Sequence, residues 1–140
     1  MLTGSAAADT KHYVTFTSGA TTIGRIEQNG TSNVAYVTSS DRRLKTIVGP
    51  IADAVDRVKA LKPYRVTWNG DAARGETDAF IADEVAGVVP DAVSGEPDAV
   101  DDDGNPEFQG LEYGALVTVL TAALQDALTR IEALEAAATP

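Results

Sequence analysis

The sequence predicts an α+β fold with a small β-rich N-terminal part, a mixed globular centre and a long C-terminal helix. Residues 11–40 mix Thr, Val, Tyr and Ile with Gly and Asn at turn positions, which is typical of short strands. Apolar residues then adopt helical spacing, and the end of the chain carries a heptad pattern. We therefore expect three regions, at 1–39, 40–110 and 111–138.

Composition excludes several classes of function. The 140 residues amount to one ordinary domain. A net charge of -10 repels phosphate backbones and anionic lipid headgroups, and the chain has no run of about 18 apolar residues. It has no cysteine and one histidine, which excludes a thiolate site and a histidine cluster. We expect no nucleic-acid partner, no membrane partner, no metal and no cofactor.

Residues 11–40 are expected to form a small antiparallel meander. Val14 and Phe16 alternate with polar residues, the sequence SGA then marks one turn, and NG at 29–30 marks another. Such a meander exposes its edges and has too few large apolar side chains to close a core. We expect it to pair with another chain or to continue an upstream part of the same polypeptide.

The centre is expected to mix short helices and strands. An amphipathic helix opened by Pro50 is predicted first. Its apolar residues recur at steps of four, three and three, at Ile51, Val55, Val58 and Leu61. A strand is predicted at 64–68, with Tyr64 and Trp68 facing the core. Residues 79–90 are expected to begin as a strand and to become a helix that stops at the final proline.

Residues 91–110 are acidic and rich in turn formers, which predicts a surface loop with little regular structure. The carboxylates at 98–107 superficially resemble a calcium loop. Counting from Asp98, Asp101 or Asp102 fails to meet the EF-hand pattern, so an acidic solvated turn is the favoured interpretation.

The last helix, over 111–138, has the spacing of a left-handed coiled coil. Its heptad seam consists of Val117, Leu120, Leu124, Ala127, Ile131, Leu134 and Ala138. Leu116 and Leu128 widen this seam, which suits a three-stranded bundle or packing against the globular part better than a two-stranded zipper. A single amphipathic helix folded back on its own domain remains the alternative.

The sequence SDRRLK holds the main candidates for chemistry. Ser40 and Lys45 lie five residues apart, with Arg42 and Arg43 between them. A serine hydroxyl needs a base, and a lysine can serve when desolvation or neighbouring cations favour its neutral form. Ser and Lys are common, however, and a basic cluster after a turn is usually a solvated face.

Two other candidates have ordinary structural explanations. Asp83 and Glu84 begin a predicted helix, where carboxylates offset the backbone dipole, although Glu84 could orient a catalytic group. His12 precedes a strand-like run and is expected to be an ordinary surface or packing residue.

Five segments in a specific order carry a resemblance to a known family. They are IGRIEQNG (23–30), VAYVTSSDRRLK (34–45), KALKPYRVTWNG (59–70), FIADEVAGVVP (80–90) and the stretch from GNPEF through the last helix (104–135). The chain resembles the C-terminal intramolecular chaperone domain of phage tailspikes, tail fibres and neck appendages, over nearly all of residues 13–137. This is a serine-peptidase family whose autocleaving relatives include the myelin regulatory factor.

The resemblance implies a homotrimer that continues a longer fibre or spike of the same polypeptide in a phage virion tail, assembled as a precursor in the bacterial cytoplasm. It implies that the domain keeps three chains in register and is then cut away between Ser39 and Ser40. Ser40 is then the nucleophile and Lys45 its base. The supporting candidates are Asp41, Arg42, Arg43 and Glu84; the oxyanion donor is left open between the arginines and the backbone amides of a neighbouring subunit.

Two other functions compete with this one. A non-cleaving trimerisation tip would keep the same architecture, with receptor contact on the acidic loop. A small monomeric domain with a folded-back C-terminal helix would need no partner chain.

Overall fold

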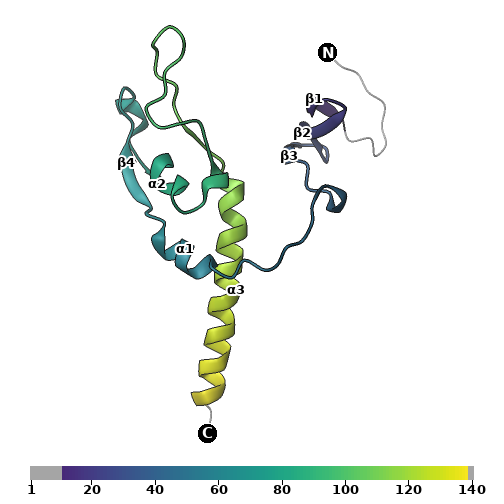
Figure 1. The fold of residues 1–140 in the computed structure, drawn as a ribbon, viewed down its shortest axis with the longest axis vertical. Helices are drawn as coiled ribbons and strands as arrows, with labels where there is room; N and C mark the ends of the chain where they lie inside the picture. Colours follow the sequence, from purple (N-terminus) through teal and green to yellow (C-terminus); the bar gives the residue numbers. More distant parts are fainter. Residues whose placement is uncertain (1–10, 139–140) are drawn as a thin grey trace. The chain divides into compact units, whose positions relative to one another are not determined.

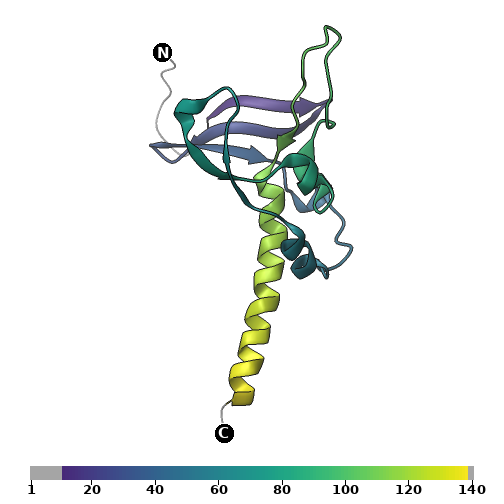
Figure 2. The ribbon, with the colours of Figure 1, turned by 90° about the vertical axis from the view of Figure 1, so that its left-hand side faces the viewer.

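The computed structural model describes residues 11–138 and shows the mixed α+β fold that the sequence predicts (Figures 1 and 2). The chain divides into two compact units, one ending at Gly49 and the other beginning at Pro50. The expected β-rich region began at residue 1, and its first ten residues lie outside the described part. Among residues 11–138, no helix is both long enough and apolar enough to cross a membrane.

The first unit contains the expected antiparallel meander. Strands β1 (His12–Ser18), β2 (Thr21–Asn29) and β3 (Asn33–Thr38) pair in the order β1-β2-β3. Gly19 and Gly30 provide the turns, with φ of 59° and 67°, a backbone region that glycine enters without steric cost. The 3-10 helix η1 (Arg42–Leu44) follows the sheet.

One face of this sheet is apolar. Val14 lies opposite Ile26, and Ile26 lies opposite Tyr36, so that all three side chains project from the same face. Phe16 lies two residues along β1 from Val14 and extends this apolar row. Tyr36 is 82% exposed, and Gly24 is the one buried residue in the described part of this unit. The sheet therefore has no core of its own.

The second unit packs short elements against one long helix. In chain order the elements are α1 (Ala54–Ala60), β4 (Tyr64–Thr67), η2 (Ala72–Arg74), β5 (Glu76–Ala79), α2 (Ala82–Ala86), η3 (Pro90–Ala92), β6 (Val93–Ser94), β7 (Gly110–Leu111) and α3 (Tyr113–Ala138). Strand β4 pairs with β5 and β6 pairs with β7, both antiparallel. The carboxylate of Glu112 accepts the amide hydrogens of Gly114 and Ala115, which caps the start of α3.

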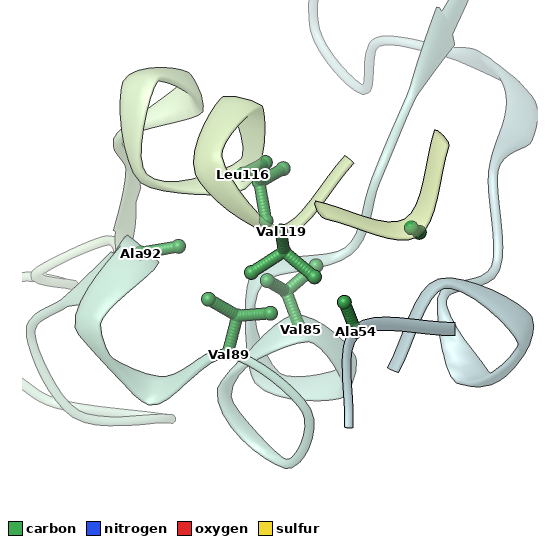
Figure 3. Packing of buried hydrophobic residues seen from close by; sticks show 7 residues of the cluster. Ala54, Val85, Val89, Ala92, Leu116 and Val119 are labelled. Carbon is green, nitrogen blue, oxygen red and sulfur yellow. The ribbon is translucent and has the colours of Figure 1, made fainter. Parts of the chain in front are cut away.

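The core of the second unit is small and made of short side chains. It consists of Ala54, Val85, Val89, Ala92, Leu116, Val119 and Ala123. Figure 3 shows Val119 of α3 directed toward Val85 and Val89. The core alanines are Ala54 of α1, Ala92 of η3 and Ala123 of α3, and their small side chains let α1 and η3 approach α3 closely. The core therefore contains few methyl groups.

Several local expectations were wrong. Helix α1 begins at Ala54 and not at Pro50, because residues 50–53 form an irregular turn whose Asp53 carbonyl accepts the amide of Arg57. The segment 79–90 also differs from the expectation: strand β5 ends at Ala79, where its pairing with β4 ends, and helix α2 ends at Ala86 and not at Pro90. Tyr64 and Trp68 are 39% and 44% exposed and do not lie in the core.

The acidic loop is closed at its base, contrary to the expectation of little regular structure. Its ends pair as β6 and β7, and Ala92 just before β6 is 1% exposed. Within the loop, the Asp101 carboxylate accepts hydrogen bonds from the Asp103 amide and from the Asn105 backbone and side chain. The hydrogen bonds from Asn105 lower the pKa of Asp101. This carboxylate therefore holds the turn together.

Helix α3 has two apolar faces. Leu116, Val119 and Ala123 are buried against the other elements of the second unit. The large seam residues are 48–70% exposed, and they are Val117, Leu120, Leu124, Ile131 and Leu134. At 3.6 residues per turn, the seam lies roughly a quarter of a turn from the buried face. The helix thus packs on its own domain with a face that is not the heptad seam, and the seam has no covering in the single chain.

Candidate functional site

Strand β3 leads directly into the expected cleavage site. Its last ladder pair joins Thr38 to Gly24. Beyond this pair, the Ser39 amide donates to the Ile23 carbonyl at 3.0 Å, and the Ser39 hydroxyl donates to the Thr22 carbonyl at 2.7 Å. The residue before the expected scissile bond is therefore fixed to β2 by two hydrogen bonds.

The chain then turns back on itself through η1. The Asp41 side chain accepts the Arg43 amide at 2.8 Å and so caps this 3-10 helix. The Leu44 amide donates to the Asp41 carbonyl at 3.0 Å, and the Lys45 amide donates to the Arg42 carbonyl at 3.2 Å. This reversal returns Lys45 to the start of the turn.

As a result, Ser40 and Lys45 meet. The Lys45 ammonium donates a hydrogen bond to the Ser40 hydroxyl, with Nζ and Oγ 2.7 Å apart. This distance is within the range required of a nucleophile and its base. Both residues are exposed, and Ser40 lines an open hollow within the first unit. The hollow is lined by Thr22, Arg25, Val37, Thr38, Ser39, Ser40, Asp41, Arg43 and Leu44.

The Arg43 side chain forms an ion pair with Asp41. Its Nε donates to Oδ1 and its Nη2 donates to Oδ2, each at 2.9 Å, in a two-point pair. Hydrogen bonds from the Arg43 side chain and amide lower the pKa of Asp41, and the Asp41 carboxylate raises the pKa of Arg43. Of the two arginines in this turn, Arg43 thus has a structural role in holding it.

Replacing Arg43 by alanine is expected to raise the pKa of Asp41 toward its ordinary value. Because folding lowers this pKa, the pair stabilises the turn at neutral pH, and that contribution is lost in acid as the pH falls through the lowered pKa. Titration of the Asp41 carboxyl carbon by NMR measures the shift. Arg42→Ala is the matched control and should leave it low, whereas an unchanged titration in Arg43→Ala would contradict this role.

Glu84 belongs to the second unit and has partners there. Its Oε1 accepts from Lys62 Nζ at 3.2 Å and from the Tyr64 hydroxyl at 3.3 Å. The hydrogen bond to Glu84 raises the pKa of Lys62; burial, followed by that carboxylate, raises the pKa of Tyr64. A role for Glu84 toward Ser40 and Lys45 stays a prediction.

Sequence reasoning missed the two carbonyls of β2 that hold Ser39. The carbonyls of Thr22 and Ile23 are backbone groups, so no residue type signals them. Only the register of the β2–β3 hairpin could have indicated which carbonyls lie beside Ser39. Within residues 11–138, no three His, Asp or Glu side chains gather in a way that could hold a metal ion.

The match to a known protein family begins at this same turn. Residues 40–94 match the model of peptidase family S74, described as chaperone of endosialidase. The match starts at Ser40 and ends with β6. No curated protein matches the chain. The match supports an intramolecular chaperone role and is consistent with a place in a phage virion tail. Residues 40–94, less than half of this chain, are therefore similar to the chaperone of endosialidase family.

Proposed function

We propose that this chain is a self-releasing intramolecular chaperone of a phage tail fibre or tailspike. It assembles as a homotrimer, sets the register of the three fibre chains to which it is attached, and is released by cleavage between Ser39 and Ser40. The observation that carries this proposal is the 2.7 Å hydrogen bond between Lys45 Nζ and Ser40 Oγ at the first residues of the family match.

The proposed reaction is an attack by a serine on the peptide bond that precedes it. Ser40 Oγ adds to the Ser39 carbonyl carbon, and its proton passes to the neutral amine of Lys45. The C–N bond then breaks as Lys45 returns this proton to the departing Ser40 nitrogen, which leaves an ester between Ser39 and Ser40 Oγ. Water hydrolyses the ester to a Ser39 carboxylate and a free hydroxyl. Because nucleophile and carbonyl are neighbours in the chain, proximity replaces a substrate pocket.

Exposure of the two residues links this reaction to assembly. A lysine acts as a base only in its neutral form, and contact with water favours the charged ammonium. Ser40 and Lys45 are exposed in the single chain. A neighbouring copy that covers Ser40 and Lys45 would remove this water and favour the neutral amine. Cleavage would then follow correct assembly rather than precede it.

Uncovered apolar surfaces in both units support a trimer. The heptad seam of α3 is exposed although its spacing is that of a coiled coil, and Leu128, which is also exposed, widens it. The sheet of the first unit presents the apolar row of Val14, Phe16 and Tyr36 with no core behind it. Each surface would be buried by contact with other copies of the chain.

A removable trimeric guide has a physical advantage for an intertwined fibre. Bringing long chains together in register carries a large entropic cost before their contacts form, and a helical bundle at one end reduces this search. Once the guide is removed, the route back through it is lost while the barrier to unfolding remains. The mature fibre is then kinetically stable.

Intact mass and sedimentation of the full chain and of Ser40→Ala test the proposal together. The wild-type chain should sediment as three copies and give pieces 1–39 and 40–140, whereas Ser40→Ala should sediment alike and stay whole. A wild-type trimer that stays whole would favour the non-cleaving tip, and a monomer would favour the small single domain. Pieces from both chains would point to a contaminating protease.

A further inference from the structure

We propose that the Ser39 hydroxyl is a positioning group for cleavage: it anchors the acyl side of the scissile bond to β2. The inference rests on the proposed self-cleavage and goes beyond it, because it gives a role to a side chain that takes no part in the bond exchange. Cleavage then requires a residue with a hydroxyl group at position 39, directly before the scissile bond.

The anchor begins where the regular sheet ends. Thr38 pairs with Gly24 in the last step of the β2–β3 ladder. Ser39 continues this pairing through its amide, which donates to the Ile23 carbonyl at 3.0 Å. Its hydroxyl then donates to the Thr22 carbonyl at 2.7 Å, one residue further back along β2. The side chain therefore extends the contact with β2 beyond the reach of the backbone.

The other side of the bond is held by a different element. Ser40 accepts from Lys45, and the turn that carries Lys45 is capped by Asp41. The scissile peptide thus lies between a sheet edge and a capped 3-10 helix. Attack requires the Ser39 carbonyl to stay at a fixed angle to Ser40 Oγ, and a small displacement of one reacting atom lowers the rate steeply. Anchoring both sides keeps the two atoms in the attacking arrangement.

The anchoring hydroxyl has a simple chemical requirement. Thr22 contributes a backbone carbonyl, which every residue type has, whereas Ser39 must contribute a donor on a short side chain. Threonine keeps this hydroxyl and fits extended backbone, while alanine removes it with little change in shape. These two replacements separate loss of the donor from a change of residue.

The test compares single-turnover cleavage of the full chain with that of Ser39→Ala and Ser39→Thr. Each protein is kept unfolded in denaturant, refolding is started by dilution, and intact mass follows the appearance of residues 40–140. Loss of one hydrogen bond should slow Ser39→Ala by about tenfold. Ser39→Thr should recover most of the rate. Ser32→Ala, in the exposed β2–β3 turn, is the matched control and should cleave as fast as wild type.

A structural role alone would give a different result. Sedimentation and circular dichroism of Ser39→Ala should equal those of wild type while its cleavage is slow. Cleavage of Ser39→Ala at the wild-type rate, or equal slowing of Ser39→Thr and Ser39→Ala, would overturn the positioning role and leave the proposed function in place. A wild-type chain that is never cut would overturn both.

Discussion

Replacing Lys45 by alanine is expected to leave the chain whole between Ser39 and Ser40. Lys45 Nζ is the group placed 2.7 Å from the Ser40 hydroxyl, and no other base is needed in the proposed reaction. Loss of a positioned general base slows such reactions by about 10²- to 10⁴-fold. Intact mass after refolding gives the rate, and Lys59→Ala, which removes an exposed lysine on α1, is the matched control.

Arginine at this position separates the role of base from the role of hydrogen-bond donor. Lys45→Arg keeps a cation that can donate to Ser40, but a guanidinium cannot lose its proton in a protein. It should therefore stay uncut under conditions in which the wild-type chain is cut. Cleavage of Lys45→Arg at the wild-type rate would exclude Lys45 as the base.

A glutamate in place of Leu124 is expected to convert the proposed trimer to monomers. Leu124 lies in the middle of the heptad seam and is 60% exposed in the single chain. Three copies would bring three carboxylates to one level of the bundle, where desolvation and mutual repulsion oppose association. Burial of each leucine contributes about 1.5–3 kcal/mol, and this is lost as well. Sedimentation velocity measures the change, and cleavage should fall with it if assembly covers Lys45.

The neighbouring position provides the control for this change. Gln125→Glu adds the same charge one residue further along α3, outside both the seam and the buried face. It should remain trimeric. Circular dichroism of Leu124→Glu should still show a helix, because Leu116, Val119 and Ala123 pack within the same chain. A trimer that survives Leu124→Glu would show that the seam is not the interface.

Local patterns in the sequence predicted most of the fold and indicated that Ser40 and Lys45 could lie close together. The alternation around Val14 and Phe16 placed the meander, and the heptads placed α3. Ser40 and Lys45 could be paired from sequence because one short turn, closed by hydrogen bonds within six residues, brings them together. Such local contacts depend little on the rest of the molecule.

Non-local packing could not be predicted in the same way. The heptad pattern marks the widest apolar stripe of α3, yet the buried face is the one where Ala123 and Ala54 allow close approach. Alanine is a weak signal in a pattern of large apolar residues. The Thr22 carbonyl that accepts from Ser39 likewise depends on strand register and on no residue type.

Under the proposed cleavage, the attachment of Ser39 to β2 would also determine how the mature fibre ends. A cut after Ser39 leaves a new carboxyl terminus one residue past β3, and both hydrogen bonds that hold this residue come from the fibre side of the cut. Exposed, poorly held termini are where proteolysis begins. A fibre chain that ended one residue after its last strand would have a C-terminus held by hydrogen bonds, which exopeptidases would reach poorly. Three such chain ends would make the tip of the fibre resistant to proteolysis.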